Sequence, residues 1–362
     1  MHVLAPLILK SFTGEQPRIT PNLLPANSAQ VAVDVRLDDG ALTPMNRPVH
    51  VYSFPGGSGD TFRTIFRHKG EWLGWNTVVN AVPGPVADDR LYYTGDGSPK
   101  MRVGGVVYPL AVPFPTSPLS AVLSGTPTDD LIVATTRIYV YTWVTQLGEE
   151  SEPSPASNEV DWVPGQIVTL SGFMSTPPGR AITKQRIYRT QTGTAGTDLY
   201  FIAERTATTS DFIDDIPVEQ FAEVIPSRAF NAPPDGLTGI ISMPNGMMVA
   251  FVGKDIYFCE PWIPHAWPEA YILTVDYEVV ALGAIGTSLI IMTRGHPYLA
   301  SGSSPSAMTM VNACRTGITG HQQGSLIAIE LINEQPKHML GFGFSSPVYL
   351  GLRFKRWCLC RN

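Results

Sequence analysis

The sequence has few charged residues and no basic stripe. Only 15% of its 362 residues are Asp, Glu, Lys or Arg, and the acids outnumber the bases by 31 to 25. A protein that binds nucleic acid through the phosphates usually carries a run or face of Lys and Arg, and none is visible before the last residues. The acidic balance is typical of an ordinary soluble protein, and it also suits a conduit through which DNA slides.

Cysteines and long apolar runs are equally scarce. The four cysteines, Cys259, Cys314, Cys358 and Cys360, have the spacing of neither a disulfide framework nor a zinc site, which predicts reduced thiols and synthesis in the cytoplasm. The apolar run Val3–Leu9 has no basic leader and is far shorter than the roughly twenty residues of a membrane-spanning helix. We therefore expect no membrane segment.

Signatures of catalysis are also missing. The Gly-rich stretch Gly56–Gly59 is followed by neither the Gly-Lys-Ser/Thr of a nucleotide loop nor a helix. His265 and Glu269 stand four apart, but prolines beside them prevent the regular helix that would present both to a metal. Adjacent acids such as Asp214 and Asp215 point to opposite faces of a strand, although carboxylates of distant strands could still meet as in a glycosidase. We predict no enzymatic activity, no metal and no cofactor.

Glycine and proline, by contrast, are abundant, at 33 and 32 residues, while 44% of the chain is hydrophobic. Many turn formers within an apolar sequence that shows no long helical periodicity predict short strands joined by tight turns, and so an all-β protein. In residues 231–302, runs rich in Val, Ile, Tyr and Phe recur roughly every ten residues, which is typical of consecutive antiparallel strands in a sandwich, barrel or propeller.

Composition also divides the chain into five regions. The proline-rich stretch at 113–118 marks one boundary. The sequence after Cys314, which is basic and in which apolar and polar residues alternate poorly, marks another. The expected architecture is a partial β-propeller with an inserted β-sandwich. The regions are an N-terminal arm and first strand at 1–50, a first propeller segment at 51–118 with about four strands, the size of one blade, the sandwich at 119–230, a second propeller segment at 231–313, and an atypical tail at 314–362.

The two terminal regions leave alternatives open. In the arm, Pro17, Pro21 and Pro25 keep the chain extended before a strand expected at Ala29–Leu37. The arm then docks on a neighbouring subunit or lies as a coil over its own domain. The tail at 314–362 is either a basic, aromatic segment that touches nucleic acid or, as we prefer, a frameshifted or truncated end.

The inserted region resembles a fibronectin type III domain in its segments. Arg186-Ile187-Tyr188-Arg189 looks like the central strand of such a domain, and Gly148-Glu149-Glu150-Ser151 looks like the turn into its last strand. Here the last-strand-like piece comes first, so the resemblance is one of architecture. Such modules usually serve as spacers or adhesive surfaces.

The segment Pro261–Pro268 is the most distinctive local feature. Trp262 and Trp267 are braced by three prolines, which makes a rigid apolar loop whose ring edges are polar. A loop of this kind could be a protein–protein anchor or a sugar-stacking platform. Alternatively it folds back and caps the core of the propeller.

Several short motifs lie in order along residues 12–313: Pro17-Arg18-Ile19-Thr20-Pro21-Asn22-Leu23-Leu24-Pro25, 29–32, 93–100, 139–155, 258–261 and 265–269. Together they resemble the tail nozzle or tail-tubular-B-like proteins of tailed bacteriophages and prophages. The resemblance implies a propeller-bearing structural subunit, typically in a hexameric ring at the distal end of a short tail, that retains and then conducts the DNA genome. No enzymatic residue carries over.

From this resemblance we expect a virion tail protein, made in the host cytoplasm, that forms a homo-oligomer. Its other partners would be adaptor or portal-proximal proteins, further tail proteins and, without sequence specificity, the DNA in the channel. The runner-up is a carbohydrate-binding or glycan-cleaving propeller used in host attachment. The candidate assembly interface comprises Pro17, Arg18, Leu23, Leu24, Trp262, His265 and Trp267.

Overall fold

The computed structural model describes residues 11–36, 40, 43–44, 49–54, 62–128, 133–193, 196–217 and 223–312. The chain falls into two units that separate between Ser53 and Phe54. The described regular structure consists of strands and short 3-10 turns, so the protein is all-β, as its composition predicts. In these ranges no helix has the length and apolar character needed to cross a membrane. The turns are η1 Pro21–Leu23, η2 Ser227–Ala229, η3 Glu269–Tyr271 and η4 Pro305–Ala307.

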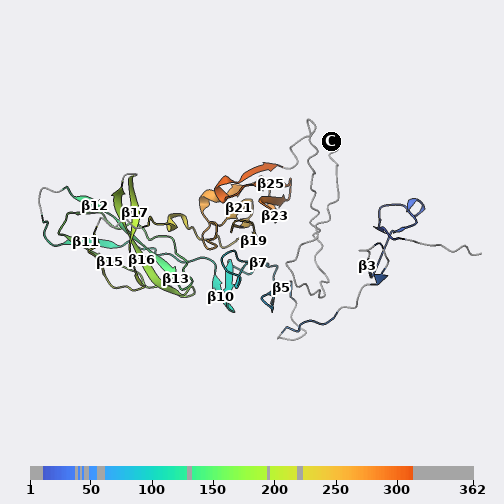
Figure 1. The fold of residues 1–362 in the computed structure, drawn as a ribbon, viewed down its shortest axis with the longest axis horizontal. Helices are drawn as coiled ribbons and strands as arrows, with labels where there is room; N and C mark the ends of the chain where they lie inside the picture. Colours follow the sequence, from blue (N-terminus) through green and yellow to red (C-terminus); the bar gives the residue numbers. More distant parts are fainter. Residues whose placement is uncertain are drawn as a thin grey trace, which may run out of the picture. The chain divides into compact units, whose positions relative to one another are not determined.

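Three sheets in the second unit are each built from four consecutive antiparallel strands (Figure 1). A four-stranded meander of this kind is the unit of a β-propeller blade. The first sheet has β7 Asn80–Pro83, β8 Arg90–Thr94, β9 Lys100–Val103 and β10 Val106–Pro109; the second has β19 Thr238–Ser242, β20 Met248–Val252, β21 Asp255–Phe258 and β22 Leu273–Thr274; the third has β23 Val279–Ile285, β24 Ser288–Thr293, β25 Tyr298–Ser301 and β26 Thr309–Asn312.

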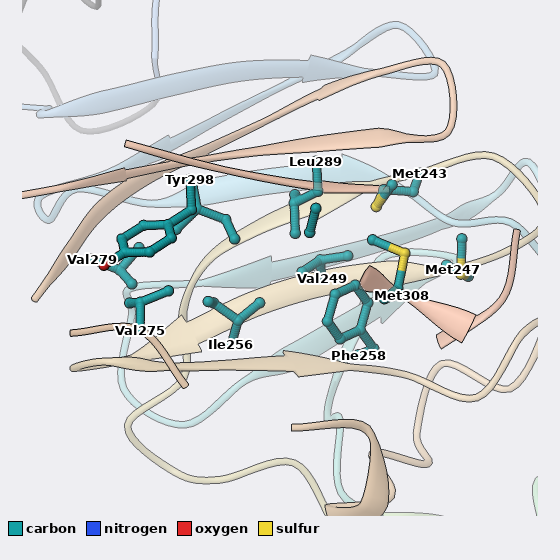
Figure 2. Packing of buried hydrophobic residues seen from close by; sticks show 12 residues of the cluster. Met243, Met247, Val249, Ile256, Phe258, Val275, Val279, Leu289, Tyr298 and Met308 are labelled. Atoms are coloured by element: carbon teal, nitrogen blue, oxygen red, sulfur yellow. The ribbon is translucent and has the colours of Figure 1, made fainter. Parts of the chain in front are cut away.

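The second of these sheets is buried on both faces. Met247 and Val249 pack toward the third sheet, where Leu289 is a neighbour (Figure 2). Met248, which lies between these two residues, packs toward the first sheet, in a cluster with Tyr92. Successive residues of a strand point to opposite faces, so a strand between two cores has to be apolar throughout. This explains the uninterrupted apolar run that the sequence shows here.

The inserted region is a two-sheet sandwich. One sheet has the order β11-β15-β18 and the other β13-β16-β17, with a short pair β12-β14 beside them (Figure 1). Its core joins Leu119, Ala121, Val168 and Leu170 to Tyr139, Tyr141, Trp143 and Ile187. The strands are β11 Ser120–Ser124, β12 Thr135–Arg137, β13 Tyr139–Thr145, β14 Val160–Trp162, β15 Ile167–Ser171, β16 Ile182–Gly193, β17 Gly196–Thr206 and β18 Phe212–Asp214.

Three serines close the outer edge of β13. Through their hydroxyls, Ser151, Ser154 and Ser157 each accept a hydrogen bond from a backbone N–H of β13, at 2.9–3.2 Å. The same serines donate their own backbone N–H groups to carbonyls of β13 at 2.8–2.9 Å. Pro153 and Pro155 lie between them and offer no N–H to a further strand. The segment therefore protects an edge that would otherwise be open to pairing with another chain.

The structure corrects two expectations for the N-terminal third of the chain. It does not contain the single strand expected at Ala29–Leu37, of which Leu37 lies outside the described residues. Instead β2 (Ser28–Ala29) pairs with β1 (Gly14–Glu15), and β3 (Val35–Arg36) pairs with β4 (Thr43–Pro44). The φ of Asp34 is 57°, which takes the backbone out of the extended region between these pairs.

The second correction concerns residues 51–118, where the sequence predicts about four strands in one blade. The described residues of this range form six strands, and β5 (Thr64–His68) and β6 (Glu71–Trp75) form a hairpin of their own. The blade-like sheet is β7–β10. The Gly and Pro spacing predicts the density of turns here but not which strands share a sheet.

A turn after β13 joins the sandwich to the four-stranded sheets. The buried Glu149 lies in this turn and accepts a 2.7 Å hydrogen bond from Nη2 of Arg180, which belongs to the sandwich. Its other oxygen faces Arg90 of β8, with 3.7 Å between Glu149 Oε1 and Arg90 Nη1. One buried carboxylate is thus shared by cations from both regions.

Glu150, the next residue, accepts four hydrogen bonds. The donors are Thr142 Oγ1, Arg186 Nη1, Tyr188 OH and Ser227 Oγ, at 2.6–3.2 Å. Burial, together with the Glu150 charge, raises the pKa of Tyr188, so its hydroxyl remains a donor. Ser227 lies in η2, beyond the last sandwich strand, so this carboxylate also fixes the path by which the chain leaves the sandwich.

We predict that Glu150→Gln lowers the free energy of unfolding by about 3–5 kcal/mol, the cost of breaking a buried, fully bonded ion pair. The amide cannot accept from all four donors and places its own N–H groups against them. Urea denaturation measures the loss. Glu204→Gln is the matched control, because the side chain of Glu204 binds the same Arg186 but is partly exposed, and about 1 kcal/mol or less is expected there. Equal losses would contradict the prediction.

Candidate functional site

The residues predicted to form an assembly interface lie in two regions of the chain. Pro17, Arg18, Leu23 and Leu24 belong to the first unit, and Trp262, His265 and Trp267 belong to the second.

The arm exposes apolar side chains. Leu23, at the end of η1, is 78% exposed, and Val31, Val33 and Val49 are exposed to a similar degree. Hydrogen bonds rather than a core hold the local conformation, among them one of 2.7 Å from Gln30 Nε2 to the carbonyl of Ile19. Among the described residues between 11 and 53, no side chain is buried. The arm consequently has apolar surface that its own unit leaves uncovered.

The other arm residues share this surface. Pro17 and Arg18 are exposed and Leu24 is half-buried. Pro21 begins η1, which suits proline because the first helical N–H has no partner within the turn. The turn thereby presents Leu23 outward on a rigid local frame.

The loop Pro261–Pro268 is held by turns of its own backbone. The N–H groups of Ile263 and Ala266 donate to the carbonyls of Glu260 and Ile263 at 2.9 and 3.0 Å. Trp262 N–H donates to the carbonyl of Gly246 at 3.1 Å. These contacts fix the loop against the turn between β19 and β20.

Trp262 is the surface residue of the loop. Its side chain is 59% exposed, and its φ of 64° is uncommon for any residue with a Cβ. The indole ring lies over Gly246, where a Cβ would come within 2.5 Å of it. Backbone strain of this kind persists only where the surroundings enforce it, and it often marks binding positions.

Trp267 and His265 are interior residues. Trp267 is 1% exposed, donates from Nε1 to the carbonyl of Pro264 at 2.9 Å, and belongs to the core between the first two four-stranded sheets. His265 Nε2 lies 2.9 Å from the carbonyl oxygen of Glu150. The burial of both residues removes them from the candidate assembly surface. This half of the loop therefore folds back and covers a core, which is the second of the two roles considered for the loop from its sequence.

Burial lowers the pKa of His265, and Arg180 acts in the same direction, although Glu149 and Glu150 oppose the shift. The imidazole is therefore neutral at physiological pH. A neutral ring with Nε2–H can donate to the Glu150 carbonyl. This contact adds to those that join the loop to the turn of the sandwich.

An apolar pocket of about 310 Å³ lies beside the loop. Phe230, Ile263, Pro268 and Tyr271 line it, and Ile263 directly follows the exposed Trp262. Glu260 supplies the polar edge and accepts a 2.9 Å hydrogen bond from the Tyr271 hydroxyl. The surface thus pairs an exposed indole with an adjacent apolar hollow, which is a common form of a protein–protein contact.

The described ranges contain no group of three or more His, Cys, Asp or Glu residues placed to hold a metal ion. Burial raises the pKa of the Cys259 thiol to about 12, so it is protonated and unreactive. Cys314, Cys358 and Cys360 lie outside the described residues.

Sequence reasoning missed the buried polar groups, among them the one formed in the sandwich by Arg137, Arg189 and Asp214. A signal was present: Arg189 ends the segment that resembles a central sandwich strand, where an inward charge demands a partner.

Comparison of the sequence with models of known protein families and with curated proteins returns no match.

We predict that Trp267→Ala lowers the free energy of unfolding by about 3–5 kcal/mol, because it empties a fully buried site and removes the bond to Pro264. Trp262→Ala is the matched control and should cost about 1 kcal/mol or less, since most of that ring is already in solvent. Denaturant titration of both variants tests the assignment of the two tryptophans. Similar losses at the two positions would contradict it.

A pH dependence follows from His265. Because its folded-state pKa lies below the ordinary value of about 6.5, protons bind the unfolded chain more tightly. The free energy of unfolding should therefore be fully maintained above pH ~6.5 and fall as the pH is lowered through that value. His265→Gln keeps an N–H donor near Nε2 but does not titrate. Denaturation between pH 5 and 8 should show a shallower decline for the variant, and parallel curves would refute the assignment.

Proposed function

We propose that the protein is a structural virion protein of a short phage tail, which forms an oligomeric nozzle or tube that retains and then conducts the DNA genome. The observation that carries this proposal is the arm, whose exposed apolar side chains have no core of their own in residues 11–53 as described. An apolar surface of this kind is stabilised by burial against another protein surface. We assign a second copy of this chain as the first partner.

The second support is the surface at Trp262. Tryptophan is enriched among residues that dominate binding energy at interfaces, and this one is held in a strained conformation beside an apolar pocket. An indole that inserts into a pocket of a neighbouring copy would make a head-to-tail contact, which closes into a ring when the rotation between copies permits. A hexamer is the ring that the family resemblance implies.

The remaining features agree with a passive role. An acidic balance of 31 acids to 25 bases disfavours tight binding of DNA phosphates, as a channel wall requires. Adaptor or portal-proximal proteins and other tail proteins are the expected neighbours, and the virion tail is the expected location. We propose no enzymatic activity.

The test is the oligomeric state of the full chain. Sedimentation velocity and electron microscopy should reveal a closed ring with an axial channel. Leu23→Asp should shift the distribution at least about tenfold toward smaller species, because a charge at a buried contact costs well over 1.4 kcal/mol. Trp262→Ser should act in the same direction.

Val122→Asp is the matched control. Val122 is also an exposed apolar residue, on a sandwich strand outside the proposed contacts, so the ring should survive this change. A monomeric wild-type chain would end the proposal. So would a ring that Leu23→Asp and Trp262→Ser leave intact.

A further inference from the structure

A buried cluster in the sandwich carries more positive than negative charge. Asp214 accepts hydrogen bonds from Arg189 Nη1 at 2.8 and 2.9 Å and from the Tyr139 hydroxyl at 2.7 Å. A second guanidinium, that of Arg137, approaches the same carboxylate at 3.4 Å. All three charged side chains are nearly inaccessible to solvent. Among the described residues, two cations therefore share one anion away from water, which is an excess of one positive charge.

The unmatched charge coincides with unmatched donors. Arg189 directs its bonds through Nη1 alone, while its Nε and Nη2 have no partner. Nη2 of Arg137 and both amide atoms of Gln191 are likewise without partners and buried. A buried donor without a partner costs free energy, and a charged one costs more. Burial and the charge of Arg189 lower the pKa of Arg137, as an excess of positive charge requires.

These groups gather at a pocket. A hollow of about 490 Å³ is lined by Arg137, Arg189 and Gln191, together with Thr135, Thr136 and Thr197. The volume falls in the range of small-molecule sites, and the wall combines guanidinium and amide groups with apolar surface from residues such as Ala134 and Ile138. The ring of Trp162 stacks on Arg137, with 3.5 Å from the guanidinium carbon to the ring centre. Stacking holds that cation in place.

We propose that this pocket binds a sugar acid, whose carboxylate takes the position opposite the Nε–Nη2 edge of Arg189. That edge presents two parallel N–H groups, the geometry that a planar carboxylate accepts in bidentate fashion. A monoanion also balances the single excess charge of the cluster, whereas a phosphate dianion would exceed it. The unpartnered atoms are inaccessible to water in this structure, so the ligand reaches them only after a side chain of the wall changes rotamer, the usual scale of adjustment on binding.

A sugar acid fits better than the acidic side chain of a protein partner. Both amide atoms of Gln191 are without partners, so this side chain offers a donor and an acceptor to the hydroxyls of a sugar ring. A glutamate side chain would leave most of these groups, and most of the volume, unused. The inference is independent of the proposed tail function, because it concerns a site within one sandwich.

The test measures binding of D-glucuronate to the full chain by calorimetry and ligand-observed NMR. Saturable binding of glucuronate, with none of glucose at the same concentration, is expected. Arg189→Lys keeps the charge but removes the Nε–Nη2 edge, so it should weaken binding about 10–100-fold, the range of one bidentate charge-assisted pair. Thermal unfolding of each variant verifies that it is folded.

Gln191→Leu provides a second variant, because it changes the wall without touching Asp214. It should also weaken glucuronate binding while the chain stays folded. Val122→Ser, on the same sandwich but away from the pocket, should bind as the wild type does. Failure of glucuronate to bind would overturn the proposal. Preference for inorganic sulfate, or for a glutamate-rich peptide over glucuronate, would also overturn it, in favour of a simple anion site or a protein contact.

Discussion

Charge removed from water has to be matched, and this constraint governs how the regions of the second unit fit together. Glu149 and Glu150 leave solvent only because Arg180, Arg186 and hydroxyl donors surround them. Their turn therefore has one acceptable position, between the sandwich and the neighbouring sheets. Apolar packing alone would tolerate small shifts of one layer over another, whereas hydrogen bonds to a buried carboxylate do not.

The fold class and most strands could be predicted from composition and alternation, but their grouping into sheets could not. The run around Met247–Ala250 is visible in sequence, yet only burial between two sheets explains why it does not alternate. At Ala29–Leu37 the alternation is present and the strand is not. Alternating side chains favour a strand only when a core covers one face, and the exposed Val31 and Val33 show that none does here.

The candidate site was only partly predictable, because the sequence does not show which face of a segment is covered by a core. Proline and tryptophan content singles out the loop at 261–268, because such residues stiffen a segment and need partners. Which tryptophan faces inward depends on turns that sequence spacing does not encode, and here a left-handed backbone at Trp262 separates the two. The cluster at Asp214 was missed because its members are far apart in the chain, and only the pairing of β13 with β16 and the approach of β18 unite them.

Two surfaces of the molecule are incomplete, and they are incomplete in different ways. The arm has apolar area without a cover, and apolar attraction is non-directional, so an extended protein surface satisfies it best. The pocket of the sandwich has directional donors and, among its described residues, an excess of one positive charge, which a small polar anion satisfies. Glu149 and Glu150, by contrast, are already satisfied, since each carboxylate is bound by an arginine of the same chain. Among the described regions, one whose charges are paired and whose apolar surface is covered stabilises the fold. A region with unpaired charge or uncovered apolar surface indicates the kind of partner it binds.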